Sequence, residues 1–223
     1  MGINFISLEK TELELKENFL SLIKLCRKMY SRLENMFTTK EINEQYIEKM
    51  DSYKFAITES RRDIRDDCIW IISKDQPRAG HLRFIIAILY SIKDIERMSE
   101  YAATIAKILH NEKLTITMIN QSSDLFLKSI AFFDQIIKLL TTENVENYEE
   151  EVNDLFHDFR ANYKKFLTFS IKEFSSKKFN KNVVVQVEHY FSFSIVIKYI
   201  DRIVDHAHSI YNNFMLIKGN SNN

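Results

Sequence analysis

The chain has 223 residues, of which 45% are apolar, including 17 Phe and 10 Tyr, and this is enough to build a substantial hydrophobic core. Only 3 Gly and 1 Pro are present, which excludes a fold rich in β-hairpin turns and a phosphate-binding glycine loop. With 31 basic and 31 acidic residues the net charge is zero, so no overall positive field favours nucleic acid or an anionic membrane surface.

Clusters of polar and turn-forming residues predict where helices end along the chain. Thr38 followed by Glu41 is a capping-box pattern that predicts a helix start near residue 39, and Pro77 fits the first turn of the next helix. Helices of this length are expected to pack lengthwise as antiparallel bundles. The predicted fold is therefore all-α, with six long helices over residues 4–37, 39–74, 77–110, 115–140, 143–176 and 182–217.

Apolar residues recur every three or four positions along these segments, as expected for the core-facing side of a helix. The stripe of the first segment comprises Leu15, Phe19, Leu22, Leu25, Cys26, Met29, Leu33 and Met36. The sixth segment carries a stripe that we also assign to the core, aromatic residues included: Val183, Val187, Tyr190, Phe191, Ile195, Ile203, Ile210, Phe214 and Ile217.

The two cysteines and the single tryptophan are also assigned to the packing of the bundle. Cys26 and Cys68 lie among apolar residues at helical spacing, so we expect buried, reduced thiols and no disulfide. Trp70 is expected to anchor the core or the edge of a bundle. The longest apolar run, Phe84–Tyr90, is far shorter than the ~20 residues needed to cross a bilayer.

Two pairs of acidic residues carry the most information about function. Glu96 and Glu100 follow the apolar stripe of the third segment with a spacing of four, so both face the same side of a helix and repel each other. Asp201 and Asp205 repeat this arrangement on the sixth segment, 105 residues later. The spacing predicts two tandem, pseudo-symmetric three-helix bundles, over residues 1–112 and 113–223.

Two interpretations of the acidic pairs are open. Four carboxylates on related surfaces suit a divalent cation or iron, and His206 or His208 would add a nitrogen ligand. Alternatively, Arg97, Arg202 and nearby lysines neutralise the acids in surface ion pairs, which are far commoner in proteins than metal sites.

The segments Asp75–Arg83 and Asp94–Ala102 resemble the first repeat of the PhoU phosphate-signalling proteins, which reads Gln-Pro-x-Ala-x-x-Leu-Arg and then Glu-Arg-Ile-Gly-Asp. Gln76 and Glu96 keep the spacing of that pattern, and Cys68 falls where the family often has a cysteine. Residues 201–207 are similar to the second-repeat form Glu-Arg-Ile-Gly-Asp-His-Ala, with Val204 in place of the glycine.

This resemblance implies a cytoplasmic protein that restrains the phosphate-starvation response, a negative regulator of phosphate uptake. The implied partners are the ATPase subunit of a phosphate ABC transporter, a sensor histidine kinase and a second copy of the chain, with membrane contact only through a partner.

The resemblance also implies metal ions at the acidic motifs, with Glu96, Glu100, Asp201 and Asp205 as ligands. The polar positions that the family carries on the second helix of each repeat align with Lys54 and Thr58, and with Asn153 and His157. Lys54 would repel a cation, whereas Asn153 and His157 are further candidate ligands.

The chain lacks the features of common helical-bundle enzymes. A di-iron oxidase uses Glu-x-x-His pairs, and the chain has only Asp154-x-x-His157 and Asp205-x-x-His208. We therefore expect a regulator and no catalytic residues. A helical spacer, which a sustained heptad seam would favour, and a metal-dependent bundle enzyme are the alternative functions.

Overall fold

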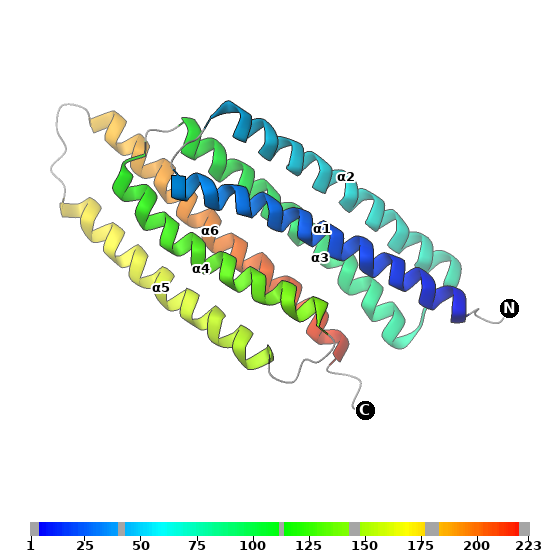
Figure 1. Ribbon diagram of the computed structural model, residues 1–223. Coiled ribbons are helices and arrows are strands. Elements are labelled where there is room, and N and C mark those ends of the chain that lie inside the picture. Colours follow the sequence, from blue (N-terminus) through cyan, green and yellow to red (C-terminus); the bar gives the residue numbers. More distant parts are fainter. Residues whose placement is uncertain (1–4, 40–42, 112–113, 143–147, 177–182, 219–223) are drawn as a thin grey trace.

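The computed structural model describes residues 5–39, 43–111, 114–142, 148–176 and 183–218 (Figure 1). Within these ranges the fold is all-α and contains no strand, which confirms the predicted class. Its six helices are α1 (Phe5–Thr39), α2 (Glu44–Asp75), α3 (Ala79–Asn111), α4 (Ile116–Thr141), α5 (Tyr148–Ser176) and α6 (Val183–Lys218).

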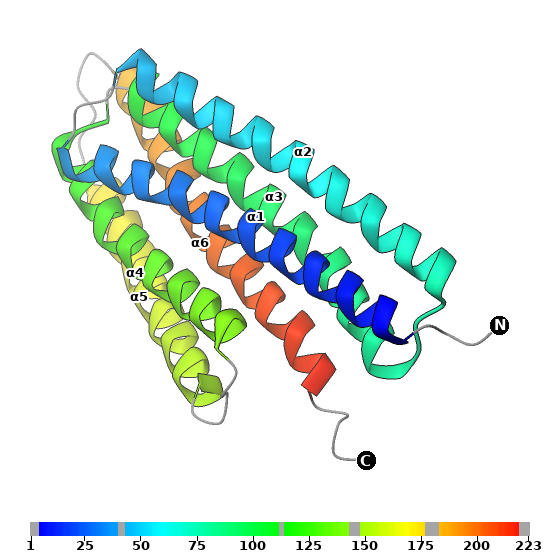
Figure 2. The same cartoon turned by 45° about the vertical axis from the view of Figure 1, so that its right-hand side comes forward.

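The helices are arranged as two groups of three that lie side by side. In the first group, α1, α2 and α3 all contact one another, and in the second α4 packs against both α5 and α6. The most extensive contact of any helix pair joins α3 to α6, and α1 also packs against α4. Figures 1 and 2 show α2 and α5 on opposite outer edges, so α3 and α6 form the central seam of the molecule. The division into repeats between residues 112 and 113 stays a prediction.

The core is one continuous cluster of apolar side chains contributed by all six helices. The stripe predicted on α1 is buried, apart from Leu25, which is partly buried. Tyr30 is fully buried beside this stripe, and its hydroxyl donates a hydrogen bond of 2.8 Å to the carbonyl oxygen of Met98. That bond offsets the cost of burying a phenol and fixes the position of α1 against α3.

Both cysteines are buried and free, as predicted. Burial raises the pKa of the Cys68 thiol to about 12, and it raises the pKa of Cys26 further. The thiols are therefore protonated packing groups, because the thiolate is the reactive form of cysteine.

The predicted start of the second helix is wrong. Thr38 does not cap a new helix, because it still belongs to α1, where its hydroxyl donates to the carbonyl oxygen of Glu34. The N-cap of α2 is Asn43, whose side chain accepts a hydrogen bond of 3.1 Å from the Tyr46 amide. Asn is among the most favourable N-cap residues, so it competes well with the pattern at Thr38.

The third helix also begins later than expected. Gln76 ends α2 in the left-handed conformation, and Ala79, with φ 50°, is the first residue of α3. Pro77 lies buried in the connection between these two residues and not in the first turn of α3.

The predicted core stripe of the sixth helix is wrong over its first turns. Val187 and Phe191 are 43% and 67% exposed, and the buried part of α6 begins only near Phe193. The physical reason is that, among the described residues, α5 makes few contacts with α6 and leaves these two side chains uncovered. Trp70 is likewise outside the core, with 51% exposure, and Lys74 lies over its ring at 4.0 Å.

The described helices include no segment that is both long and apolar enough to cross a membrane.

Candidate functional site: the acidic motifs of the third and sixth helices

An arginine from α5 lies between the two acids of the second-half motif. Asp201 and Asp205 stand one turn apart on α6, and Arg160 of α5 donates one terminal N–H group to each of them. Arg202 donates a further hydrogen bond of 3.0 Å to Asp205. The sequence places two like charges side by side here, and the tertiary structure puts a planar cation between them.

The guanidinium of Arg160 is held in place by an aromatic ring. Its central carbon lies 4.8 Å from the ring centroid of Phe156, one turn earlier on α5. Phe156 in turn stacks on His208 of α6, with 4.0 Å between the ring centroids. A planar guanidinium stacks on an aromatic ring better than an ammonium group does. The contact with Phe156 therefore helps to orient Arg160 toward the two acids.

Asp201 is the more deeply placed acid of this pair, with only 16% of its side chain exposed. Burial raises the pKa of its carboxyl, and the neighbouring charge of Asp205 raises it as well. Arg160 and Arg202 lower the same pKa, but the net shift is upward. Because the charged carboxylate is disfavoured even with Arg160 present, removal of that arginine would leave it poorly compensated.

In the first-half motif, formed by Glu96 and Glu100, an arginine from a neighbouring helix contacts one of the two acids. The Nε of Arg61, on α2, lies 3.1 Å from a carboxylate oxygen of Glu96, and 19% of the Glu96 side chain is exposed. Glu100 is more exposed and accepts a hydrogen bond of 2.7 Å from Arg97 on its own helix. The ion pairs expected from Arg97 and Arg202 are therefore present, and each first acid also receives an arginine from the second helix of its group.

His206, a candidate metal ligand, is engaged in the seam between α3 and α6. Its Nδ1 lies 2.7 Å from a carboxylate oxygen of Asp94, and its Nε2 lies 3.4 Å from the Tyr101 hydroxyl. Tyr101 also stacks on Tyr199 at 4.8 Å. Both ring nitrogens of His206 thus face a partner from α3.

The residues of these seam contacts are related by the same sequence offset as the two acidic pairs. The 105-residue offset that relates Glu96 to Asp201 also relates Asp94 to Tyr199 and Tyr101 to His206. The contact between Asp94 and His206 is therefore the counterpart of the contact between Tyr199 and Tyr101. Pairs of contacts that exchange in this way are what a two-fold arrangement of related halves produces.

The remaining candidate ligands are His208 on α6 and Asn153 and His157 on α5. His208 is partly buried between aromatic rings, and its Nδ1 lies 3.4 Å from the Asn212 side-chain nitrogen. His157 is exposed on α5, and Asn153 is partly buried one turn before it.

The titration of His208 should contribute to the dependence of stability on pH. Burial lowers the pKa of His208, and Arg160 and His157 lower it further. The unfolded chain then binds more protons, so this residue makes the protein less stable as the pH falls from about 6.5 through the lowered pKa. We expect His208→Phe, which keeps the ring against Phe156, to flatten the decline in the free energy of urea unfolding between pH 7.5 and pH 5. An unchanged slope in the variant would refute this assignment.

The side chains present do not fit a metal ion at the second-half motif. A divalent cation binding there would need the oxygens of Asp201 and Asp205, and both already accept hydrogen bonds from Arg160. Among the residues that the structure describes, no group of three or more His, Cys, Asp or Glu side chains is arranged to hold a metal ion.

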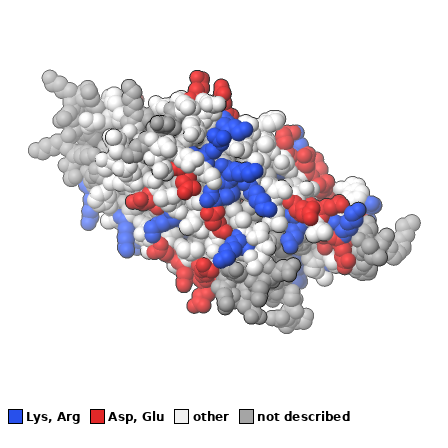
Figure 3. Space-filling model, viewed as in Figure 1, with Lys and Arg blue, Asp and Glu red and all other residues white. Residues whose placement is uncertain are grey.

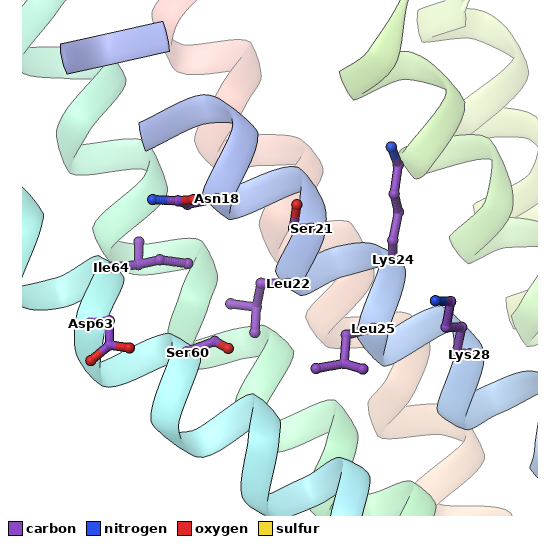
Figure 4. A pocket seen from close by; sticks show the side chains of 9 residues that line it. All are labelled: Asn18, Ser21, Leu22, Lys24, Leu25, Lys28, Ser60, Asp63 and Ile64. Carbon is purple, nitrogen blue, oxygen red and sulfur yellow. The ribbon is translucent and has the colours of Figure 1, made fainter. Parts of the chain in front are cut away.

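An open groove lies between α1 and α2, away from the acidic motifs (Figure 4). It has a volume of about 470 Å³, an apolar floor formed by Leu22, Leu25 and Ile64, and polar residues at its rim. Lys24 and Lys28 belong to the rim, and in Figure 4 the side chain of Lys24 points away from Ser60 and Asp63. In a site for a small molecule a few polar groups converge on the ligand. The polar groups of this groove do not converge on one point.

Comparison with known proteins finds a family match for the first part of the chain. Residues 19–109, which include α2, most of α1 and almost all of α3, match the family described as the PhoU domain. The chain is therefore similar to the PhoU domain over residues 19–109. The matched PhoU segment contains both acids of the first-half motif and Arg61.

Several proteins align with this chain over most of its length. An uncharacterized protein of Mycoplasma genitalium is 24% identical over 97% of this chain and 96% of its own length. A Thermotoga maritima protein named phosphate-specific transport system accessory protein PhoU homolog 1 is 22% identical, over 81% of this chain and 76% of that protein.

Two solved structures share the fold. The phosphate transport system regulatory protein PhoU from Streptococcus pneumoniae superimposes with a TM-score of 0.76, at 18% identity, over 95% of this chain and 96% of that one. PhoU from Pseudomonas aeruginosa gives a TM-score of 0.68 at 19% identity, over 95% of this chain and 99% of that one.

Sequence reasoning missed Arg61 and Arg160, the arginines that reach the acids from the second helix of each group, although a signal for them exists. The alignment that pairs Thr58 with His157 also pairs Arg61 with Arg160, three residues further along each helix. Two arginines at equivalent positions, one turn beyond the aligned polar residues, could have been matched to the two acidic motifs. Asp94 and Tyr101 were also missed as partners of His206, because only helix packing brings them together.

Proposed function

We propose that this protein is a regulatory accessory protein of a phosphate transport system and acts through protein contacts without catalysis. The match of residues 19–109 to the PhoU domain carries this proposal. The Thermotoga maritima relative, named as a phosphate-specific transport accessory protein, supports it because most of both chains align.

The proposed partner is the ATPase subunit of a phosphate ABC transporter, contacted from the cytoplasmic side, with a sensor histidine kinase as a second partner and a homodimer as the working form. Regulation would restrain uptake and the starvation response when phosphate is plentiful. The affinity for the transporter would therefore depend on phosphate supply.

The surface suits protein contacts better than nucleic-acid binding. On the face in Figure 3, basic side chains gather near the middle and acidic ones surround them, so the signs are mixed. Large aromatic side chains are also exposed, among them Phe55 on α2 and Tyr90 on α3, at 68% and 64%. Exposed aromatic residues are typical of protein interfaces.

The two alternative functions have less support. A spacer would hold its partners apart through an extended array, whereas α1 packs on α4 and α3 on α6, which brings the halves side by side. A metal-dependent enzyme needs open coordination positions, and at the second-half motif Arg160 lies on both acids.

Crosslinking in the source cells tests the proposal directly. We expect the tagged full-length protein to co-purify with the phosphate transporter's ATPase subunit, at a level that changes at least severalfold between phosphate-rich and phosphate-starved cells. The ATPase subunit of an unrelated ABC transporter in the same cells is the control. Equal recovery of the two ATPase subunits, or recovery of neither, would refute the proposed partner.

A further inference from the structure

We propose that the guanidinium of Arg160 replaces a metal ion in the second-half acidic motif, so that this motif is complete without metal. This inference does not depend on the proposed regulatory role. It concerns only what holds Asp201 and Asp205 together.

The contacts of Arg160 are those that a bridging cation would make. Its two terminal nitrogens each donate to a different carboxylate, so a single side chain links both acids of α6 to α5. A bridging metal ion would link the same two carboxylates from one point. The planar guanidinium does this with directional hydrogen bonds and without desolvating a divalent ion.

The local charges already balance. Asp201 and Asp205 contribute two negative charges, and Arg160 and Arg202 contribute two positive ones, with Arg202 bonded to Asp205. A divalent ion entering this group would meet two arginines at close range. It would also have to displace Arg160 from both acids and from its place over the Phe156 ring.

The equivalent arginine in the first half strengthens the inference. Arg61 of α2 reaches Glu96 at 3.1 Å, and the offset between Arg61 and Arg160 equals that between the aligned residues Thr58 and His157. Both halves therefore place an arginine from the second helix on the first acid of the third helix. In the second half Arg160 reaches both acids, so the second-half motif is the better one to test.

The test measures Mn²⁺ on the purified full-length protein after treatment with EDTA and dialysis against Mn²⁺. We expect the wild-type motif to retain no Mn²⁺ that depends on Asp201, and the Tm to be the same in EDTA and in Mn²⁺. Arg160→Gln frees both carboxylates while keeping a polar side chain. This variant is expected to retain about one Mn²⁺ per chain and to gain several degrees in Tm when Mn²⁺ replaces EDTA.

Two further variants make the result specific. Arg202→Gln removes a positive charge from the same motif but leaves Arg160 in place, so it should gain no Mn²⁺. Asp201→Asn added to Arg160→Gln should abolish the gained binding.

Three results would overturn the proposal. The first is stoichiometric Mn²⁺ on the wild type that Asp201→Asn removes, and the second is a folded Arg160→Gln variant that binds none. If Arg160→Gln fails to fold even with Mn²⁺, Arg160→Lys replaces it, because a single ammonium bridges two acids poorly and should allow weak Mn²⁺ binding. The third result is a folded Arg160→Lys variant that binds no more Mn²⁺ than the wild type.

Discussion

Phe126→Ala is expected to lower the free energy of unfolding by about 3–5 kcal/mol, the usual cost of truncating a buried Phe. Phe126 on α4 is fully buried, and its ring packs against Phe37 at 4.8 Å and Tyr30 at 6.1 Å, both on α1. The substitution therefore opens a cavity at the contact between the two halves. Urea unfolding followed by circular dichroism measures the loss.

Two substitutions serve as controls for this prediction. Phe126→Leu keeps most of the apolar volume and should cost less than half as much as Phe126→Ala. Phe55→Ala removes the same group from a side chain that is 68% exposed and should change the free energy by about 0.5 kcal/mol or less. If Phe126→Ala cost no more than Phe55→Ala, the packing of α4 on α1 described here would be incorrect.

Arg160→Met is expected to lower the free energy of unfolding at pH 7 by about 2 kcal/mol, measured in the same way. Breaking a fully buried ion pair costs about 3–5 kcal/mol and an exposed pair contributes about 1 kcal/mol or less, and this cluster lies between those limits. The Arg160 side chain is 32% exposed, and that of Asp201 is 16% exposed. Methionine keeps an apolar stem against Phe156, so the loss reports mainly on the two unpaired carboxylates.

The matched controls use the other members of the cluster. Arg202→Met removes an arginine that is 52% exposed and pairs with Asp205 alone of the two acids, so it should cost about 0.5 kcal/mol or less. Adding Asp201→Asn and Asp205→Asn to Arg160→Met should recover most of the lost stability, because no unpaired carboxylate then remains and the charge of Arg202, which is 52% exposed, is solvated. A triple variant as unstable as Arg160→Met would show that the arginine acts through packing and not through its charge.

The core stripe of α1 could be predicted from sequence because its spacing is a local property. Every third or fourth residue from Leu15 to Met36 is apolar, and a helix places such residues on one side whatever surrounds it. The same rule failed at Val187 and Phe191 of α6, where the residues repeat correctly but α5 does not cover them. Periodicity predicts which face of a helix is apolar, not whether another helix packs on it.

The acidic motifs divide in the same way between local pattern and tertiary packing. Sequence alone determined that Glu96 with Glu100, and Asp201 with Asp205, are like-charged pairs one turn apart on helices, since this follows from a spacing of four residues. One of its two interpretations, ion pairs of Arg97 and Arg202 with the acids, matches the pairs that these arginines form within their own helices.

Only the tertiary structure decided which cation reaches the buried member of each pair. Arg160 meets Asp201 across 41 positions of sequence, and His206 meets Asp94 across 112. These contacts depend on how α5 is placed next to α6 and how α6 is placed next to α3. The spacing of residues within one helix carries no information about the placement of another helix. The sequence by itself determined the six-helix, all-α character and the repeated acids, because both depend on local geometry. The packing of helices distant in sequence placed an arginine on Glu96 and bridged Asp201 to Asp205 through Arg160.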